Sequence, residues 1–125
     1  MMAQVTAAAL TSEIKTLAHP AGVDSIPTSA NREDHVSMSM SASLKAWRSL
    51  ELARHVLAVE LLCACQAIDL LQPLRSSAPL MRVHDFIRAA VPTLEDDRST
   101  SADLARIAVM IARGGLERAC AMNVN

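Results

Sequence analysis

Polar side chains that could take part in chemistry gather in one stretch between two strongly helical segments. They lie within residues 17–38 and are Asp24, Asn31, Arg32, Glu33, Asp34 and His35. A polar loop of this length is unusual inside a compact helical protein, and long ordered loops are more often functional than idle. Their carboxylate, amide, guanidinium and imidazole groups can donate or accept hydrogen bonds. We therefore expect the functional site in this loop.

Two other kinds of chemistry are poorly supported by the residue spacing. Asp34 and His35 lie near several serines, but adjacent positions form no proton relay unless the fold aims them together, and no nucleophile-elbow motif is present. Cys63 and Cys65 are two residues apart on an expected helix, so they face different ways, and with His55 they do not complete a tetrahedral metal site. We expect no metal, and interpret both cysteines as small core residues.

The composition favours packed helices. The chain has 125 residues, enough for one domain, with 51% hydrophobic and 2% aromatic residues. A core of aliphatic residues and methionine without aromatics is more typical of helices than of sheets. The net charge is −1, and the basic residues are scattered without aromatic stacking partners. These features argue against a nucleic-acid or acidic-membrane partner.

The N-terminus and the cysteines favour a cytoplasmic protein. The first residues lack the positive region and cleavage site of a secretory signal. The three cysteines are best interpreted as reduced thiols. The apolar run 56–71 is interrupted by Glu60, Gln66 and Asp69, so it does not predict a membrane span.

The first expected helix covers residues 1–18 and ends at His19 and Pro20, because the residue before a proline is pushed out of the α region. No capping residue precedes it, which suggests that the chain begins inside a helix. A second helix over residues 38–71, without glycine or proline, would be roughly 50 Å long at about 1.5 Å per residue.

Apolar residues at a three-four spacing are expected to line one face of this second helix. It consists of Leu50, Ala53, Leu57, Leu61, Ala64, Ile68 and Leu71. From Val56 onward the other faces are apolar as well, so we expect packing partners that the chain itself does not supply. Glu60 within this apolar segment is expected to have a buried partner such as an arginine, because an unpaired buried charge is costly.

Shorter helices are expected in the remaining third of the chain. One should run from Ser77 to about Ala90, and another from Ser101 to Gly114–Gly115, with a last helical turn over residues 116–121. The residues expected to face inward in the second of these are Leu104, Ile107, Ala108 and Ile111. The predicted fold is therefore all-α, a long-helix bundle segment with a long functional loop and shorter C-terminal helices.

Five sequence words, in this order and at these spacings, carry a family resemblance. They are VTAAAL at 5–10, KTLAHP at 15–20, VDSIPTSAN at 23–31, EDHVSM at 33–38 and LAVELL at 57–62. The chain resembles the C-terminal part of the histidine ammonia-lyases, in the aromatic amino acid lyase family. The resemblance is strong over residues 2 to about 71 and continues more weakly to the end. It implies one helical unit over residues 1–125, with the N-terminal, electrophile-bearing part absent.

The resemblance implies a homotetrameric enzyme that eliminates ammonia from L-histidine to give urocanate. The family's electrophile is a methylidene-imidazolone formed from an internal Ala-Ser-Gly, and its expected base is a tyrosine. This chain contains no Ala-Ser-Gly and no tyrosine. We therefore expect the isolated chain to be inactive.

Glu33 is the residue that the resemblance places beside the substrate, where its carboxylate could accept hydrogen bonds from the imidazole or the amine. The phenylalanine and tyrosine lyases have a neutral glutamine there, so a glutamate favours a substrate with N–H donors. Composition alone would favour a solvated loop residue. Asn31 and Arg32 are possible neighbours in the site.

Three positions depart from the family pattern. Arg32 replaces a usual glutamine and could form an ion pair with Glu33 or Asp34, weakening the carboxylate as a base. Gly22 replaces a serine, and Ser39 replaces a glycine. Two alternatives remain open: a free-standing helical interaction module that docks on a lyase subunit, or a fragment of a tyrosine or phenylalanine lyase or an aminomutase.

Overall fold

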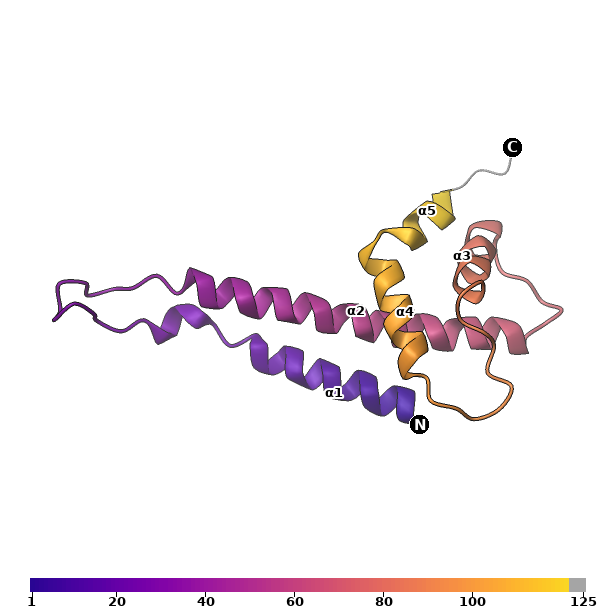
Figure 1. Ribbon diagram of the computed structural model, residues 1–125, viewed down its shortest axis with the longest axis horizontal. Helices are drawn as coiled ribbons and strands as arrows, with labels where there is room; N and C mark the ends of the chain where they lie inside the picture. The colour runs from indigo at the N-terminus through magenta and orange to yellow at the C-terminus, as the bar shows by residue number, and fades with distance from the viewer. Residues whose placement is uncertain (122–125) are drawn as a thin grey trace.

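A computed structural model of the chain describes residues 1–121 (Figure 1). The elements are α1 (Met2–Leu17), the 3-10 helix η1 (Ala21–Asp24), α2 (Ser39–Leu70), α3 (Ala78–Arg88), α4 (Ser101–Ala112) and α5 (Gly115–Ala121). Within these residues the only β pairing is a single isolated bridge in the long loop. The predicted all-α fold is confirmed.

The N-terminal arm, residues 1–57, is an elongated hairpin of α1, the long loop and the first part of α2. In Figure 1, α1 runs alongside α2, and the loop reverses the chain at one extreme of the molecule. The Lys45 ammonium group donates a hydrogen bond to the His19 carbonyl oxygen just beyond α1. Arg48 on α2 donates to Glu13 on α1 over 3.0 Å. None of the residues of α1 is buried, so the two helices share little enclosed core.

The C-terminal cluster, residues 58–121, contains the main hydrophobic core. Here α4 crosses the second half of α2, and α3 and α5 complete the packing (Figure 1). The buried members of this core are Ala58, Leu62, Cys65, Ile87, Val91, Ile107 and Ala108. Ile87, Val91 and Ile107 are 0% exposed. Side chains from three helices and the segment after α3 therefore enclose one another completely.

The expected helix ends are close to those observed. Within α4, Ile107 and Ala108 are buried, and Leu104 and Ile111 pack partly buried against them, as predicted. Gly114 follows α4 with a φ of +64°, the left-handed conformation that glycine allows at a helix C-terminus. A Cβ added to Gly115 would lie 3.0 Å from the Phe86 ring, so the absence of a side chain permits close packing of α5 on α3.

The predicted apolar face of α2 is only partly covered, with Leu61 packed against the core. Leu50 and Leu57 are 50% and 47% exposed. The buried residues of α2 are Leu52, Ala58, Val59, Leu62 and Cys65. Because the second half of α2 is apolar on every side, periodicity could not show which side α1 and α4 cover.

Two further expectations for α2 are corrected. Glu60 is exposed rather than buried, and the ion pairs among residues 1–121 do not include it. Cys65 is a buried core residue as expected, whereas Cys63 is exposed. Within the described part of the chain, no helix is both long enough and apolar enough to cross a membrane.

Candidate functional site

The backbone of the long loop closes into a narrow hairpin around Glu33. The Thr28 N–H donates to the Glu33 carbonyl over 2.9 Å, and the Glu33 N–H donates back to the Thr28 carbonyl over 3.3 Å. The Arg32 N–H donates to the Ser29 carbonyl inside this pair over 3.2 Å. Paired backbone groups on both sides fix the position of the Glu33 Cα, although the loop contributes no regular strand.

The tip of the hairpin has an unusual backbone conformation. Ser29, Ala30 and Asn31 have φ values of +53°, +55° and +66°. Left-handed conformations are disfavoured for residues with a Cβ atom, and such residues cluster at binding and catalytic sites. Three in succession mark this turn as a candidate functional segment.

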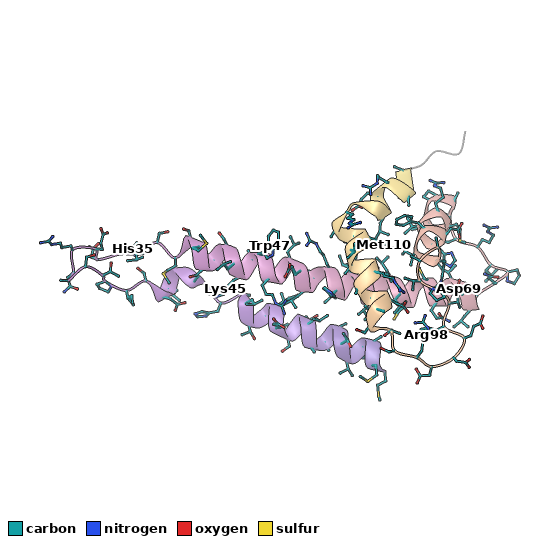
Figure 2. The ribbon with its side chains drawn as sticks, viewed as in Figure 1. His35, Lys45, Trp47, Asp69, Arg98 and Met110 are labelled. Atoms are coloured by element: carbon teal, nitrogen blue, oxygen red, sulfur yellow. The ribbon has the colours of Figure 1, made fainter. Side chains whose placement is uncertain are left out.

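A second pair of hydrogen bonds closes the base of the same loop. The Ser25 hydroxyl donates to the Val36 carbonyl over 3.0 Å and accepts from the Val36 N–H over 2.9 Å. Figure 2 shows His35 in this loop, at the opposite end of the molecule from Asp69. The arm therefore ends in a loop that two pairs of hydrogen bonds hold closed, far from the hydrophobic core.

The structure places Asn31, Arg32 and Glu33 together in one turn, and all three are exposed. Asp24, also expected in the site, is exposed near the base of the loop. The possible ion pair between Arg32 and a neighbouring carboxylate is not observed, because the ion pairs of the described residues include none from the loop over residues 18–38. The Glu33 carboxylate therefore forms no ion pair with another described residue.

The two other family departures cause no visible distortion. A Cβ added at Gly22 would meet no atom within 4 Å. Ser39 begins α2 and is not among the residues with positive φ. The loop therefore does not depend on a serine at one position or a glycine at the other to reach this conformation.

A polar cluster that sequence reasoning missed lies where α2 meets α3. Asp69 accepts a hydrogen bond from Arg88 Nε over 2.9 Å and from the Thr93 hydroxyl over 3.0 Å, and it lies 2.7 Å from His84 Nε2. Arg88 Nη2 also lies 2.7 Å from the Asp69 carboxylate, close enough for an ion pair but poorly directed for a hydrogen bond. These residues are 15 to 24 positions apart in sequence, so no local motif revealed them.

The cluster changes the proton affinity of its members. Burial would by itself raise the pKa of Asp69, but hydrogen bonds from His84 and Thr93 and the charge of Arg88 outweigh it and lower the pKa below its ordinary value. Burial raises the pKa of the nearby Cys65 thiol, with Arg88 opposing and Asp69 adding to the shift. Both effects favour a structural role, with Asp69 ionised and Cys65 in its thiol form.

Other polar contacts hold the segments around α4. Gln66 donates to the Leu94 carbonyl over 3.1 Å and accepts from the Leu94 N–H over 3.0 Å. Asp103, 1% exposed, accepts hydrogen bonds from Arg98 and Arg106. Across residues 1–121, no group of three histidine, cysteine or carboxylate side chains could hold a metal ion.

Comparisons with known proteins agree with the sequence resemblance. The aromatic amino acid lyase family model matches residues 1–89. Histidine ammonia-lyase from Anaeromyxobacter sp. (strain K) is 52% identical over 117 residues, which cover 94% of this chain and 23% of that protein. The enzyme of the same name from Stigmatella aurantiaca is 48% identical over 116 residues, covering 93% of this chain and 23% of that protein.

Solved structures show the same arrangement of helices. The crystal structure of histidine ammonia-lyase from Trypanosoma cruzi matches with a TM-score of 0.91 and 42% identity, over 96% of this chain and 24% of that chain. Tyrosine aminomutase from Streptomyces globisporus matches with a TM-score of 0.90 and 33% identity, over 98% and 24%. The chain thus spans about a quarter of the length of these relatives. It belongs to the aromatic amino acid lyase family.

Proposed function

We propose that residues 1–125 form the C-terminal helical part of a histidine ammonia-lyase, which eliminates ammonia from L-histidine to give urocanate. The observation that carries this proposal is the exposed Glu33 carboxylate, on a turn whose backbone is already fixed. The relatives named histidine ammonia-lyase are 48–52% identical to the chain, whereas the tyrosine aminomutase structure is 33% identical. This difference favours histidine as the substrate.

In this proposal, Glu33 recognises the substrate through nitrogen. Its carboxylate accepts a hydrogen bond from the imidazole N–H or the amine, an interaction that a phenyl or phenol ring cannot offer in the same way. Asn31 lies in the same turn and can donate or accept through its amide. Arg32 adds a positive charge beside the carboxylate and can contact an anionic group of the substrate.

The residues present do not fit the family's electrophilic group. A methylidene-imidazolone forms from Ala-Ser-Gly, and this triplet is absent from the sequence, as is tyrosine. The electrophile and the base therefore have to come from other parts of the lyase. This chain contributes substrate recognition and part of the helical framework.

The proposed enzyme is a cytoplasmic homo-oligomer, a tetramer as in the family, with no nucleic-acid or membrane partner. Exposed apolar side chains on the arm support the assembly, because large exposed apolar patches commonly mark protein interfaces. They include Met40, Leu44, Trp47, Leu50 and Leu57. A second lyase subunit would cover them.

The test joins this chain to the remaining part of a histidine ammonia-lyase relative and measures urocanate formation from L-histidine. The isolated chain should give no turnover above a heat-killed control, and the joined enzyme should be active. In the joined enzyme, Glu33→Gln should lower kcat/KM for histidine by at least about tenfold, because charge-assisted hydrogen bonds are worth roughly 1.5–3 kcal/mol. Glu95→Gln, the same change at an exposed residue outside the loop, should have a much smaller effect.

Each alternative function predicts a different result. An active joined enzyme that is insensitive to Glu33→Gln would make Glu33 a solvated loop residue. The aminomutase alternative, supported by the structural match to tyrosine aminomutase, predicts that the joined enzyme converts L-tyrosine in preference to L-histidine. The interaction-module alternative predicts that the chain binds an intact lyase without restoring activity to a truncated one.

A further inference from the structure

The Ser25 hydroxyl lies where the two sides of the loop around Glu33 meet the helices. Ser25 directly follows η1, which packs against α2 and contains Ala21, a residue that is only 6% exposed. Its partner Val36 lies shortly before α2 begins. Ser25 and Val36 are half-buried, whereas every residue from 26 to 35 is exposed, at one extreme of the molecule (Figure 1). The hydroxyl therefore joins two segments that the helices already hold.

Backbone hydrogen bonds alone do not close the base of this loop. Among residues 1–121, the backbone pairing between its two sides is confined to Thr28 and Glu33, apart from one bond inside the turn. Pro27 has no N–H, so it cannot add another. The Ser25 hydroxyl instead donates to the Val36 carbonyl over 3.0 Å and accepts from the Val36 N–H over 2.9 Å. A hydroxyl can make both bonds because it is a donor and an acceptor at once, and a methyl group can make neither.

The bonds at the base determine how firmly the Glu33 backbone is held. The Thr28–Glu33 pair lies at the exposed tip, and backbone hydrogen bonds that water can reach open readily. The Ser25–Val36 pair is partly shielded from solvent, where a hydrogen bond is electrostatically stronger. If the base opens, the two sides of the loop separate, and the pair at the tip has to hold a wider loop by itself. The position of the Glu33 carboxylate thus depends on the Ser25 hydroxyl.

We propose that Ser25 is a positioning residue of the substrate site, and that its hydroxyl holds the Glu33 carboxylate where a nitrogen of histidine meets it. Ser25 acts through Glu33 and does not itself contact the substrate. The inference rests on the proposed function, in which Glu33 recognises the imidazole or the amine. A loop that is closed before binding takes less of the binding free energy to order. This contribution is equal in the ground state and the transition state, so losing the hydroxyl should raise KM and leave kcat nearly unchanged.

Hydrogen exchange of the joined enzyme without substrate, followed by mass spectrometry, tests whether the hydroxyl closes the loop. The peptide over residues 26–35 reports on the bonds at the tip, which Ser25 does not make itself. Ser25→Ala should speed its exchange at least about fivefold, because two hydrogen bonds at the base are lost. Ser25→Thr keeps the hydroxyl and should restore most of the protection. Unchanged exchange in Ser25→Ala would overturn the proposal.

Ser49→Ala is the matched control for this experiment. Ser49 is also half-buried in the arm, but its hydroxyl bonds only to the Lys45 carbonyl of its own helix. This variant should leave the exchange of residues 26–35 and the kinetics unchanged. An equal effect of Ser25→Ala and Ser49→Ala would mean that the loop responds to any lost hydroxyl in the arm, which would contradict the proposal.

Kinetics of the joined enzyme test whether Ser25 acts through Glu33. Ser25→Ala should raise KM for L-histidine at least about fivefold and change kcat by less than about twofold, and Ser25→Thr should behave like the unchanged enzyme. In an enzyme that already carries Glu33→Gln, adding Ser25→Ala should change kcat/KM by less than about twofold, because residues that act as one unit are not additive.

The same cycle separates this inference from the proposed function. If Glu33→Gln lowers kcat/KM and Ser25→Ala lowers it further by its full single-variant factor, the two residues act independently and only the Ser25 proposal fails. If Glu33→Gln alone leaves the histidine kinetics unchanged, the recognition role of Glu33 fails first, and the role of Ser25 in the substrate site fails with it.

Discussion

Leu44 and Leu62 belong to the same helix, yet Leu44 is 64% exposed and Leu62 is 3% exposed. Leu62 lies where α4 crosses α2 and joins the core of the C-terminal cluster. Leu44 lies in the arm, where α1 covers another side of the helix. The comparison shows that one side of the second half of α2 is buried by α4, whereas the side of the first half that carries Leu44 is left open.

The two regions therefore obtain their stability in different ways. In the C-terminal cluster, apolar side chains from several segments exclude water completely, as Ile87 and Ile107 do. The arm relies on the polar contacts of Lys45 and Arg48 and on partial apolar contact between two helices. Solvent-exposed polar pairs contribute little to stability. A binding partner should therefore stabilise the arm more than it stabilises the C-terminal cluster.

The largest difference is expected from the same substitution at the two leucines. Leu62→Ala should lower the free energy of unfolding by about 2–5 kcal/mol, because it opens a cavity in a closed core. Leu44→Ala should lower it by less than about 0.5 kcal/mol, as is usual for exposed positions. Urea denaturation at the lowest workable protein concentration measures both, because dilution limits the contribution of self-association. Similar losses for the two variants would mean that the arm is enclosed in the isolated chain.

A smaller effect is expected from Trp47, which is 62% exposed on the arm and labelled in Figure 2. The isolated chain should form oligomers or aggregates by analytical ultracentrifugation. Trp47→Ser should weaken this association by at least about tenfold, since aromatic residues dominate most interfaces. Leu74→Ser, at an exposed residue outside the arm, is the control and should have little effect. A monodisperse monomer before any substitution would refute the idea that the arm needs a partner.

The smallest effect is expected on acidification and is confined to the C-terminal cluster. The pKa of Asp69 is lowered in the folded chain. The stability that it contributes is therefore complete above its ordinary pKa of about 4 and is lost as the pH falls through the lowered value. In the Asp69→Asn variant, the free energy of unfolding, measured by circular dichroism, should depend less on pH in the acid range. Asp96→Asn, at an exposed turn, should leave it unchanged.

Helix positions could be predicted from the sequence because their end signals are local. Pro20 and Gly114 end helices through their own backbone properties. Ser77 directly precedes α3, although its side chain forms no capping hydrogen bond. The observed helix ends lie within a residue or two of those expected. The loop around Glu33 was also anticipated, from its length and polarity. Its left-handed turn was not, because Ser29 and Ala30 give no local signal for positive φ.

The enclosed faces and the polar cluster could not be predicted, because both depend on which segments meet in space. Leu57 and Leu62 are equally apolar, and only the path of α4 decides that Leu62 is covered. Asp69, His84 and Arg88 look like ordinary surface residues until α3 folds back onto α2. The sequence contains one indication of the polar cluster: His84 and Arg88 are four residues apart, so they lie on the same face of a helix.

The turn formed by Ser29, Ala30 and Asn31 also affects how much order a ligand would have to impose. Ser29 and Ala30 each lose roughly 1–2 kcal/mol of stability by adopting the left-handed conformation without being glycine, whereas asparagine tolerates it better. A glycine at Ala30 would remove that steric penalty, but it would widen the range of conformations open to the unbound loop. Because these residues have a Cβ atom, the turn loses its conformational freedom when the chain folds and not when a ligand binds. A molecule that arrives at the Glu33 carboxylate then loses less of its binding free energy to ordering the turn.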